Sequence, residues 1–205
     1  MSSGRLPLPS DRLRPATSAP FAAASGSASL WKQAYAKSSI PCRVCHGSVH
    51  HSLVWKVEPD TLLAADRGCG FAELLVLCAH GLSERDWPHT FIASTAWETL
   101  LLGTAGAREA VVKALPQLVP PLRAALASTV DEVVLGALQA TRQLAQCCGA
   151  SLLPYVGPLL VPLSAADWRM PLKGAVRATF SELLSRCGPD ALREIRRKLP
   201  GFTAG

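Results

Sequence analysis

Residues 115–199 repeat themselves with a period of about 39 residues, and this repeat constrains the fold more than any single motif does. The segment LAQCCGASLLPYVGPLL at 144–160 aligns with LLSRCGPDALREIRRKL at 183–199. Helix pairs that recur every ~40 residues are typical of HEAT and armadillo solenoids, which bury a continuous core and present long surfaces to partners. The repeat therefore predicts an all-α, armadillo/HEAT-like helical solenoid and a binding protein rather than an enzyme. The aligned pairs are Val133 with Leu172, Ala137 with Val176, Thr141 with Phe180, Leu144 with Leu183, Cys148-Gly149 with Cys187-Gly188, Leu153 with Leu192, Val156 with Ile195 and Leu160 with Leu199.

Composition agrees with helix-on-helix packing, since the 205-residue chain is 49% hydrophobic but only 6% aromatic. We expect an extended, partly disordered basic arm at 1–30, a short adaptor segment at 31–60 and a helical repeat domain at 61–205. No stretch approaches the ~20 uninterrupted apolar residues of a membrane span, and the first residues lack the apolar core of a secretory signal. We therefore expect an intracellular protein whose seven cysteines stay reduced.

The chain carries a formal net charge of +6. An excess of this size weakly favours an acidic partner, which is a nucleic acid, an anionic membrane or an acidic protein surface, although positive charge also serves solubility. Arg12 and Arg14 make the N-terminal arm basic. The arm is either a disordered linker or a segment that orders on a partner.

Apolar periodicity predicts a helix that begins near Trp31 and ends before Ser38, and an extended strand over 49–57 (VHHSLVWKV) that ends at Glu58-Pro59-Asp60. We expect Pro120 and Pro121 to kink the helix that contains them. Asp131 is predicted to be an N-cap and Gly149 a C-cap of one helix, with Gln143 on its solvent side. The longer helices are expected at 71–82, 89–102, 107–115, 115–126, 131–148, 152–163, 172–187 and 191–199.

The motif Cys42-Arg43-Val44-Cys45-His46 matches the spacing of c-type haem attachment, but no export signal supports haem. With His50 and His51 the same segment contains enough donors for a tetrahedral zinc site. Zinc folds usually combine two separated ligand pairs, however, and strand alternation sends His50 and His51 to opposite faces. We therefore expect surface or partner-facing histidines, with no metal and no cofactor. No phosphate loop, nucleophile elbow or paired carboxylate site predicts catalysis.

The last predicted helix has the most concentrated positive charge. Leu192, Ile195 and Leu199 are expected to face inward, which leaves four cations outside: Arg193, Arg196, Arg197 and Lys198. This face is either the solvated cap that ends a helical array or a partner-binding surface.

Several segments of the chain resemble the parkin co-regulated gene protein family, and specifically its "-like" branch. The resemblance runs from about Asp11 to Thr203 and is most specific in the run from Ile40 to Trp55. It is carried by DRLRPATSAPF at 11–21, IPCRVCHGSVHHSLVW at 40–55, HTFIASTAWETLLL at 89–102, ALPQLVPPLRAALASTVDEVV at 114–134 and IRRKLPGF at 195–202.

The resemblance implies an armadillo-type solenoid without enzymatic activity. The better-known members of this family are ciliary and flagellar proteins that bind tubulin and help to join the A and B tubules of doublet microtubules. It therefore implies a cytoskeletal protein of the axoneme or basal body that binds tubulin and other axonemal proteins, with no nucleic acid and no membrane as partner. The candidate partner-binding residues are Arg12, Arg14, Lys32, Lys37, Arg43, His46, His51, Trp55, Arg193, Arg196, Arg197 and Lys198.

Two alternatives stay open. The first is a soluble armadillo-type adaptor that holds a peptide or helix of another protein in a groove. The second is a small metalloprotein built on Cys42, Cys45 and the neighbouring histidines.

Overall fold

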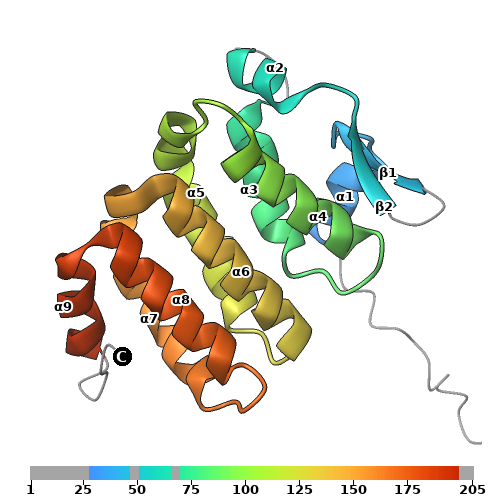
Figure 1. The fold of residues 1–205 in the computed structure, drawn as a ribbon. Coiled ribbons are helices and arrows are strands. Elements are labelled where there is room, and N and C mark those ends of the chain that lie inside the picture. Colours follow the sequence, from blue (N-terminus) through green and yellow to red (C-terminus); the bar gives the residue numbers. More distant parts are fainter. Residues whose placement is uncertain (1–27, 47–50, 66–69, 199–205) are drawn as a thin grey trace, which may run out of the picture.

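The computed structural model describes residues 28–46, 51–65 and 70–198, and these residues form a mostly helical protein (Figure 1). The predicted arm up to residue 27, with Arg12 and Arg14, lies outside the described residues, as do His50 and Leu199.

The N-terminal part contains a helix and a small hairpin. Helix α1 (Leu30–Ala36) is followed by strands β1 (Cys42–His46) and β2 (His51–Trp55), which pair antiparallel with Cys42 opposite Trp55. The predicted short helix and the strand within 49–57 are confirmed. Strand β1 and the short helix α2 (Pro59–Ala64) were not predicted. The strand ends before Glu58-Pro59-Asp60, as predicted, and Pro59 then lies in the first turn of α2, where its missing amide hydrogen would have no helical partner anyway.

The remaining helices form two rows. Helices α3 (Phe71–Gly81), α5 (Arg108–Leu126), α7 (Leu153–Asp167) and α9 (Pro189–Lys198) pack in that order, with α1 against α3. Helices α4 (His89–Glu98), α6 (Asp131–Cys148) and α8 (Lys173–Cys187) form the second row. The repeated segments are thus neighbours, because α6 packs on α8 and α7 packs on α9 (Figure 1). A π-helical turn (Thr99–Gly103) extends α4 to the predicted end at Gly103.

Helix α5 differs from the prediction of two helices that meet at Leu115. It runs unbroken from Arg108 to Leu126 although Pro116, Pro120 and Pro121 lie inside it. A proline inside a helix destabilises it by ~3 kcal/mol, whereas burial of one leucine side chain stabilises the fold by ~1.5–3 kcal/mol. The helix continues because its leucines on either side of the prolines share one buried face: Leu115, Leu118, Leu122 and Leu126.

Two details of α6 also correct the predictions. Its N-cap is Val130 rather than Asp131, because the Asp131 carboxylate accepts a hydrogen bond from Arg169 instead of from the first amides of the helix. Gln143 is buried rather than solvent-facing. Helix α6 packs against α5, α8 and α4, so its buried arc is wider than a single face.

The two Cys-Gly pairs of the repeat end equivalent helices. Gly149 has φ +57° and ends α6, and Gly188 has φ +82° and ends α8. Residues with a side chain rarely adopt positive φ, so both positions favour glycine. The predicted C-cap at Gly149 is confirmed, and the Sγ of Cys187 lies 3.4 Å from the Gly149 carbonyl oxygen.

Residues 131–167 are long and apolar enough to cross a membrane by length and composition alone. They form two helices, α6 and α7, divided by a 3-10 turn (Gly149–Leu152). The apolar face of α6, including Val134, Leu138 and Leu144, lies in the common core.

Candidate partner-binding surfaces

The predicted partner-binding residues that the structure describes fall into two groups at opposite ends of it (Figure 1). One group lies on α1 and the hairpin, and the other lies on α9. The structure therefore does not assemble them into one site.

Lys32 of the first group makes ion pairs within the protein. Its Nζ lies 3.2 Å from Glu84 Oε2 and 2.7 Å from Asp86 Oδ2. Ser29 Oγ also donates a hydrogen bond to the buried Glu84 carboxylate. The hydrogen bond to Asp86 raises the pKa of Lys32, and the same contact lowers the pKa of Asp86. Lys32 thus ties α1 to the segment after α3, and most of its charge is neutralised there.

The other residues of this group differ in exposure. Lys37 and Arg43 are exposed, and neither forms an ion pair with another described residue. The His51 ring is exposed and lies 5.4 Å from the Trp87 ring and 6.4 Å from that of Phe91, centroid to centroid. Trp55 is half-buried and packs against the core. The backbone of His46 ends β1, and its side chain lies outside the described structure.

The cysteines of the C-x-x-C-H motif do not converge. Cys42 and Cys45 are three residues apart on β1, so their side chains leave opposite faces of the strand. Cys42 is buried, which raises the pKa of its thiol to about 12, whereas Cys45 is exposed. Within the described residues no group of three His, Cys, Asp or Glu side chains is arranged to hold a metal ion.

Helix α9 presents the predicted cations, but two of them are paired along the helix. Ala191 and Ile195 are buried against the neighbouring helices. Arg193 donates to Asp190, which raises the pKa of Arg193, and Arg197 Nη2 lies 2.6 Å from Glu194 Oε2. The two remaining cations, Arg196 and Lys198, are exposed and have no ion pair within the described part of the chain.

A groove of about 520 Å³ lies between α7 and α9. Its walls combine apolar residues of α7 with the two ion-paired residue pairs of α9, so positive and negative side chains are balanced in it. The lining residues are Leu153, Pro154, Gly157, Pro158, Asp190, Arg193, Glu194 and Arg197.

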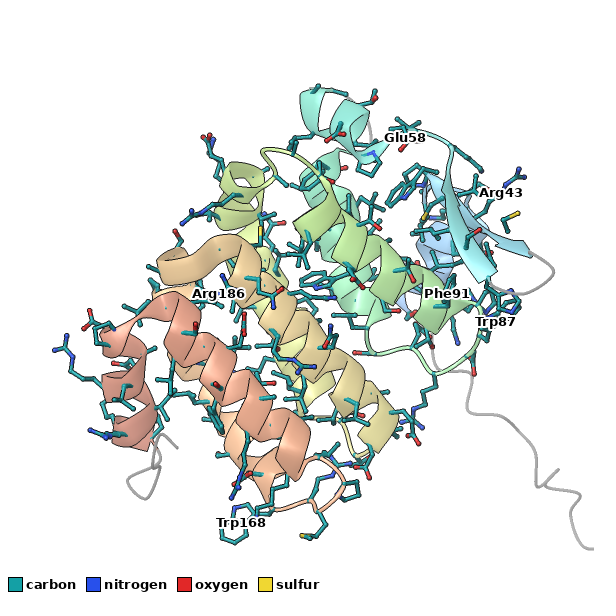
Figure 2. All side chains as sticks on the ribbon, in the orientation of Figure 1. Arg43, Glu58, Trp87, Phe91, Trp168 and Arg186 are labelled. Carbon is teal, nitrogen blue, oxygen red and sulfur yellow. The ribbon has the colours of Figure 1, made fainter. Side chains whose placement is uncertain are left out.

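Sequence reasoning missed an exposed apolar turn between α7 and α8. Trp168 and Met170 lie there, and Figure 2 shows Trp168 projecting from the end of the helical body. The signal was present in the sequence, because two large apolar residues fall where the helical periodicity stops.

Most of the chain matches a known protein family. The model of the family described as Parkin co-regulated protein matches residues 29–204. The match includes the hairpin and both rows of helices, as far as α9 at the end of the first row.

Proposed function

Because the chain belongs to the parkin co-regulated protein family, we propose that it is a non-catalytic, microtubule-associated scaffold protein of cilia and flagella that binds tubulin. The family match over residues 29–204 carries the proposal. Its place is the cytoskeleton, on axonemal doublets or at the basal body, and its partners are tubulin and other axonemal proteins.

We also propose that α3 to α9 form an armadillo/HEAT-type solenoid. The support is the order of packing, in which each helix contacts the next helix of its own row, and α3 contacts α4, α5 contacts α6 and α7 contacts α8 across the rows. The repeat of about 39 residues agrees with it, since positive-φ glycines end the equivalent helices α6 and α8. Such arrays offer extended faces to partners.

Charge supports an acidic partner. Tubulin presents an acidic surface, and the chain carries a net charge of +6 with unpaired cations at both ends of its described part. Arg196 and Lys198 lie at one end, and Lys37 and Arg43 lie at the other. Contacts between exposed charges weaken as salt screens them, so the binding should be strongest at low ionic strength.

Co-sedimentation with microtubules tests the proposal. The full chain should pellet with microtubules at about 50 mM salt and less at about 300 mM, because the screening length shortens. Arg196→Ala/Lys198→Ala should weaken pelleting and flatten its salt dependence. The control Arg85→Ala/Lys113→Ala removes two exposed cations, one from the loop between α3 and α4 and one from α5, and should leave pelleting near that of the wild type. A wild-type chain that stays in the supernatant at low salt would refute tubulin binding.

A second candidate, a soluble adaptor for a peptide or helix of another protein, is favoured by the groove between α7 and α9. Its apolar α7 residues and balanced α9 charges suit an amphipathic segment. Recovery of one stoichiometric partner in a pull-down without tubulin would support the adaptor. Loss of that partner on Leu153→Ala/Pro158→Ala would assign it to the groove.

A further inference from the structure

Helix α7 extends past the end of its neighbour α9. Helix α9 ends at Lys198, and the repeat pairs Leu160 of α7 with Leu199, so α7 continues for about two more turns beyond that level. The groove between the two helices reaches along α9 as far as Arg197. The segment that follows Lys198 in the chain therefore begins at one end of the groove.

The face of α7 that lines the groove is apolar and continues beyond α9. Leu153, Gly157 and Pro158 line the groove, and Val161 follows Gly157 by one helical turn on the same face. Val161 is 54% exposed, so the described residues leave more than half of this apolar side chain uncovered. An apolar strip thus leads out of the groove to the level at which α9 ends.

The charged side chains of the groove favour an uncharged occupant. Arg193 pairs with Asp190, and Arg197 pairs with Glu194, within α9 itself. Two positive and two negative groups therefore line the groove, and neither of the two further cations of α9 does. Because the charges cancel, the groove selects neither an acidic nor a basic segment.

Residues 199–205 have the matching chemistry. They lie outside the described residues, read LPGFTAG, contain no charged side chain and include Leu199 and Phe202 as large apolar groups. Their sequence predicts a turn, because proline followed by glycine fits the two central positions of a type II turn. Phe202 comes four residues after Lys198, so even an extended chain places it within ~13–14 Å of the end of α9.

We propose that residues 199–205 turn back into the groove between α7 and α9 and close it, with the Phe202 ring against Pro158 and Val161. This inference concerns the groove alone and does not depend on tubulin binding. A short covalent connection supplies the segment at an effective concentration of about 1 mM or more, which favours it over a free peptide. A peptide partner of the adaptor candidate would have to displace the segment before it could bind.

NMR of the full chain tests the contact directly. Nuclear Overhauser cross-peaks should connect the ring protons of Phe202 with the methyl protons of Val161, and Phe202→Ala should shift the amide resonance of Gly157 but not that of Gly136 on α6. Absence of the cross-peaks together with an unmoved Gly157 resonance overturns the proposal. Cross-peaks between differently labelled chains in a mixed sample show that a second copy supplies the segment, and they overturn the intramolecular arrangement.

A fluorescent peptide of residues 199–205 measures how far the groove is closed. It should bind the full-length Phe202→Ala variant at least about tenfold more tightly than the wild type, because the altered segment no longer competes from its high effective concentration. Equal binding to the two chains overturns the closure of the groove by this segment.

Two glycine substitutions, each made in the Phe202→Ala background, distinguish the groove from other surfaces. Gly157→Leu places a side chain in the groove, and the nearest atom to the added Cβ is Glu194 Oε2 at 3.8 Å, an ordinary contact. The matched control Gly136→Leu lies inside α6 with nothing within 4 Å of the added Cβ. Gly157→Leu should weaken peptide binding at least about tenfold, and the control should stay within about twofold. Equal binding by the two variants, with matching thermal unfolding, overturns the groove as the site.

Discussion

Trp31 of α1 and Gly81 of α3 pack so closely that a Cβ atom built on Gly81 lies 2.7 Å from Trp31 Cδ2. The same Cβ atom lies 2.6 Å from the Cβ of Ala93 on α4. Trp31 is fully buried at this contact. Glycine at position 81 therefore lets α1 and α4 approach α3 at one point, and this contact joins the N-terminal part to the two rows of helices.

Gly81→Ala should destabilise the protein, because neither the Trp31 ring nor the Ala93 Cβ is the free end of a flexible side chain. Overpacking of this kind costs ~1–3 kcal/mol of the free energy of unfolding. Urea unfolding followed by far-UV circular dichroism measures it. Gly136→Ala, in the interior of α6 with nothing within 4 Å of the added Cβ, is the control. It should stabilise by up to ~1 kcal/mol, and equal effects of the two variants would contradict the packing argument.

The free energy of unfolding should also depend on pH, through the ion pair between Lys32 of α1 and Asp86. The contact lowers the pKa of Asp86, so its contribution is complete above the unfolded value of ~4 and is lost as pH falls through the lowered pKa. It raises the pKa of Lys32, so the contribution is complete below ~10.4 and is lost as pH rises through the raised pKa. Asp86→Asn should therefore lower the urea midpoint at neutral pH.

The difference between Asp86→Asn and the wild type should shrink as the pH approaches 3. The control Glu98→Gln, which alters an exposed carboxylate on α4, should show no such convergence. A difference for Asp86→Asn that is the same at neutral and acidic pH would mean that the amide acts through something other than the ion pair.

Apolar periodicity predicted most helices because burial of one face decides where a helix forms in a layered α protein. It divided α5 at Leu115 and expected a kink at Pro120 and Pro121, because local rules count the cost of prolines but not the buried leucines that keep the helix continuous. It missed β1 because the motif from Cys42 to His46 was considered for metal ligation, and the pairing with β2 that makes it a strand is not visible in the segment alone.

The candidate surfaces were predicted only in part. The outward cations of α9 follow from helix geometry, but Asp190 and Glu194 on the same helix neutralise two of them. The role of Lys32 depends on Glu84 and Asp86, which are more than fifty residues away in the chain. Trp168 was missed because a turn between helices was treated as a connector, and its exposure follows only from how the helices pack.

Cysteine reactivity should separate the two thiols of the C-x-x-C-H motif. Alkylation requires the thiolate, and burial raises the pKa of Cys42 to about 12, whereas Cys45 is exposed. In the folded protein at about pH 8, iodoacetamide should modify Cys45 well before Cys42, as followed by peptide mapping. In urea the two rates should become similar. Equal rates in the folded protein would mean that β1 does not bury Cys42.

Arg169 should be needed to hold the turn after α7, and lysine should not replace it. The guanidinium reaches two carbonyls and one carboxylate at once, on Ser128, Thr129 and Asp131. An ammonium group is a single point that cannot match this fork. Arg169→Lys should therefore lose most of what Arg169→Ala loses, about 1–2 kcal/mol of the free energy of unfolding, since the site is partly exposed.

Hydrogen exchange localises the effect of these variants. Amide protection should fall in residues 128–131 and 168–172 while α3 stays protected, because the three hydrogen bonds join only those two turns. If Arg169→Lys keeps this protection, positive charge at position 169 is sufficient, and the forked geometry of the guanidinium is not what holds the turn in place.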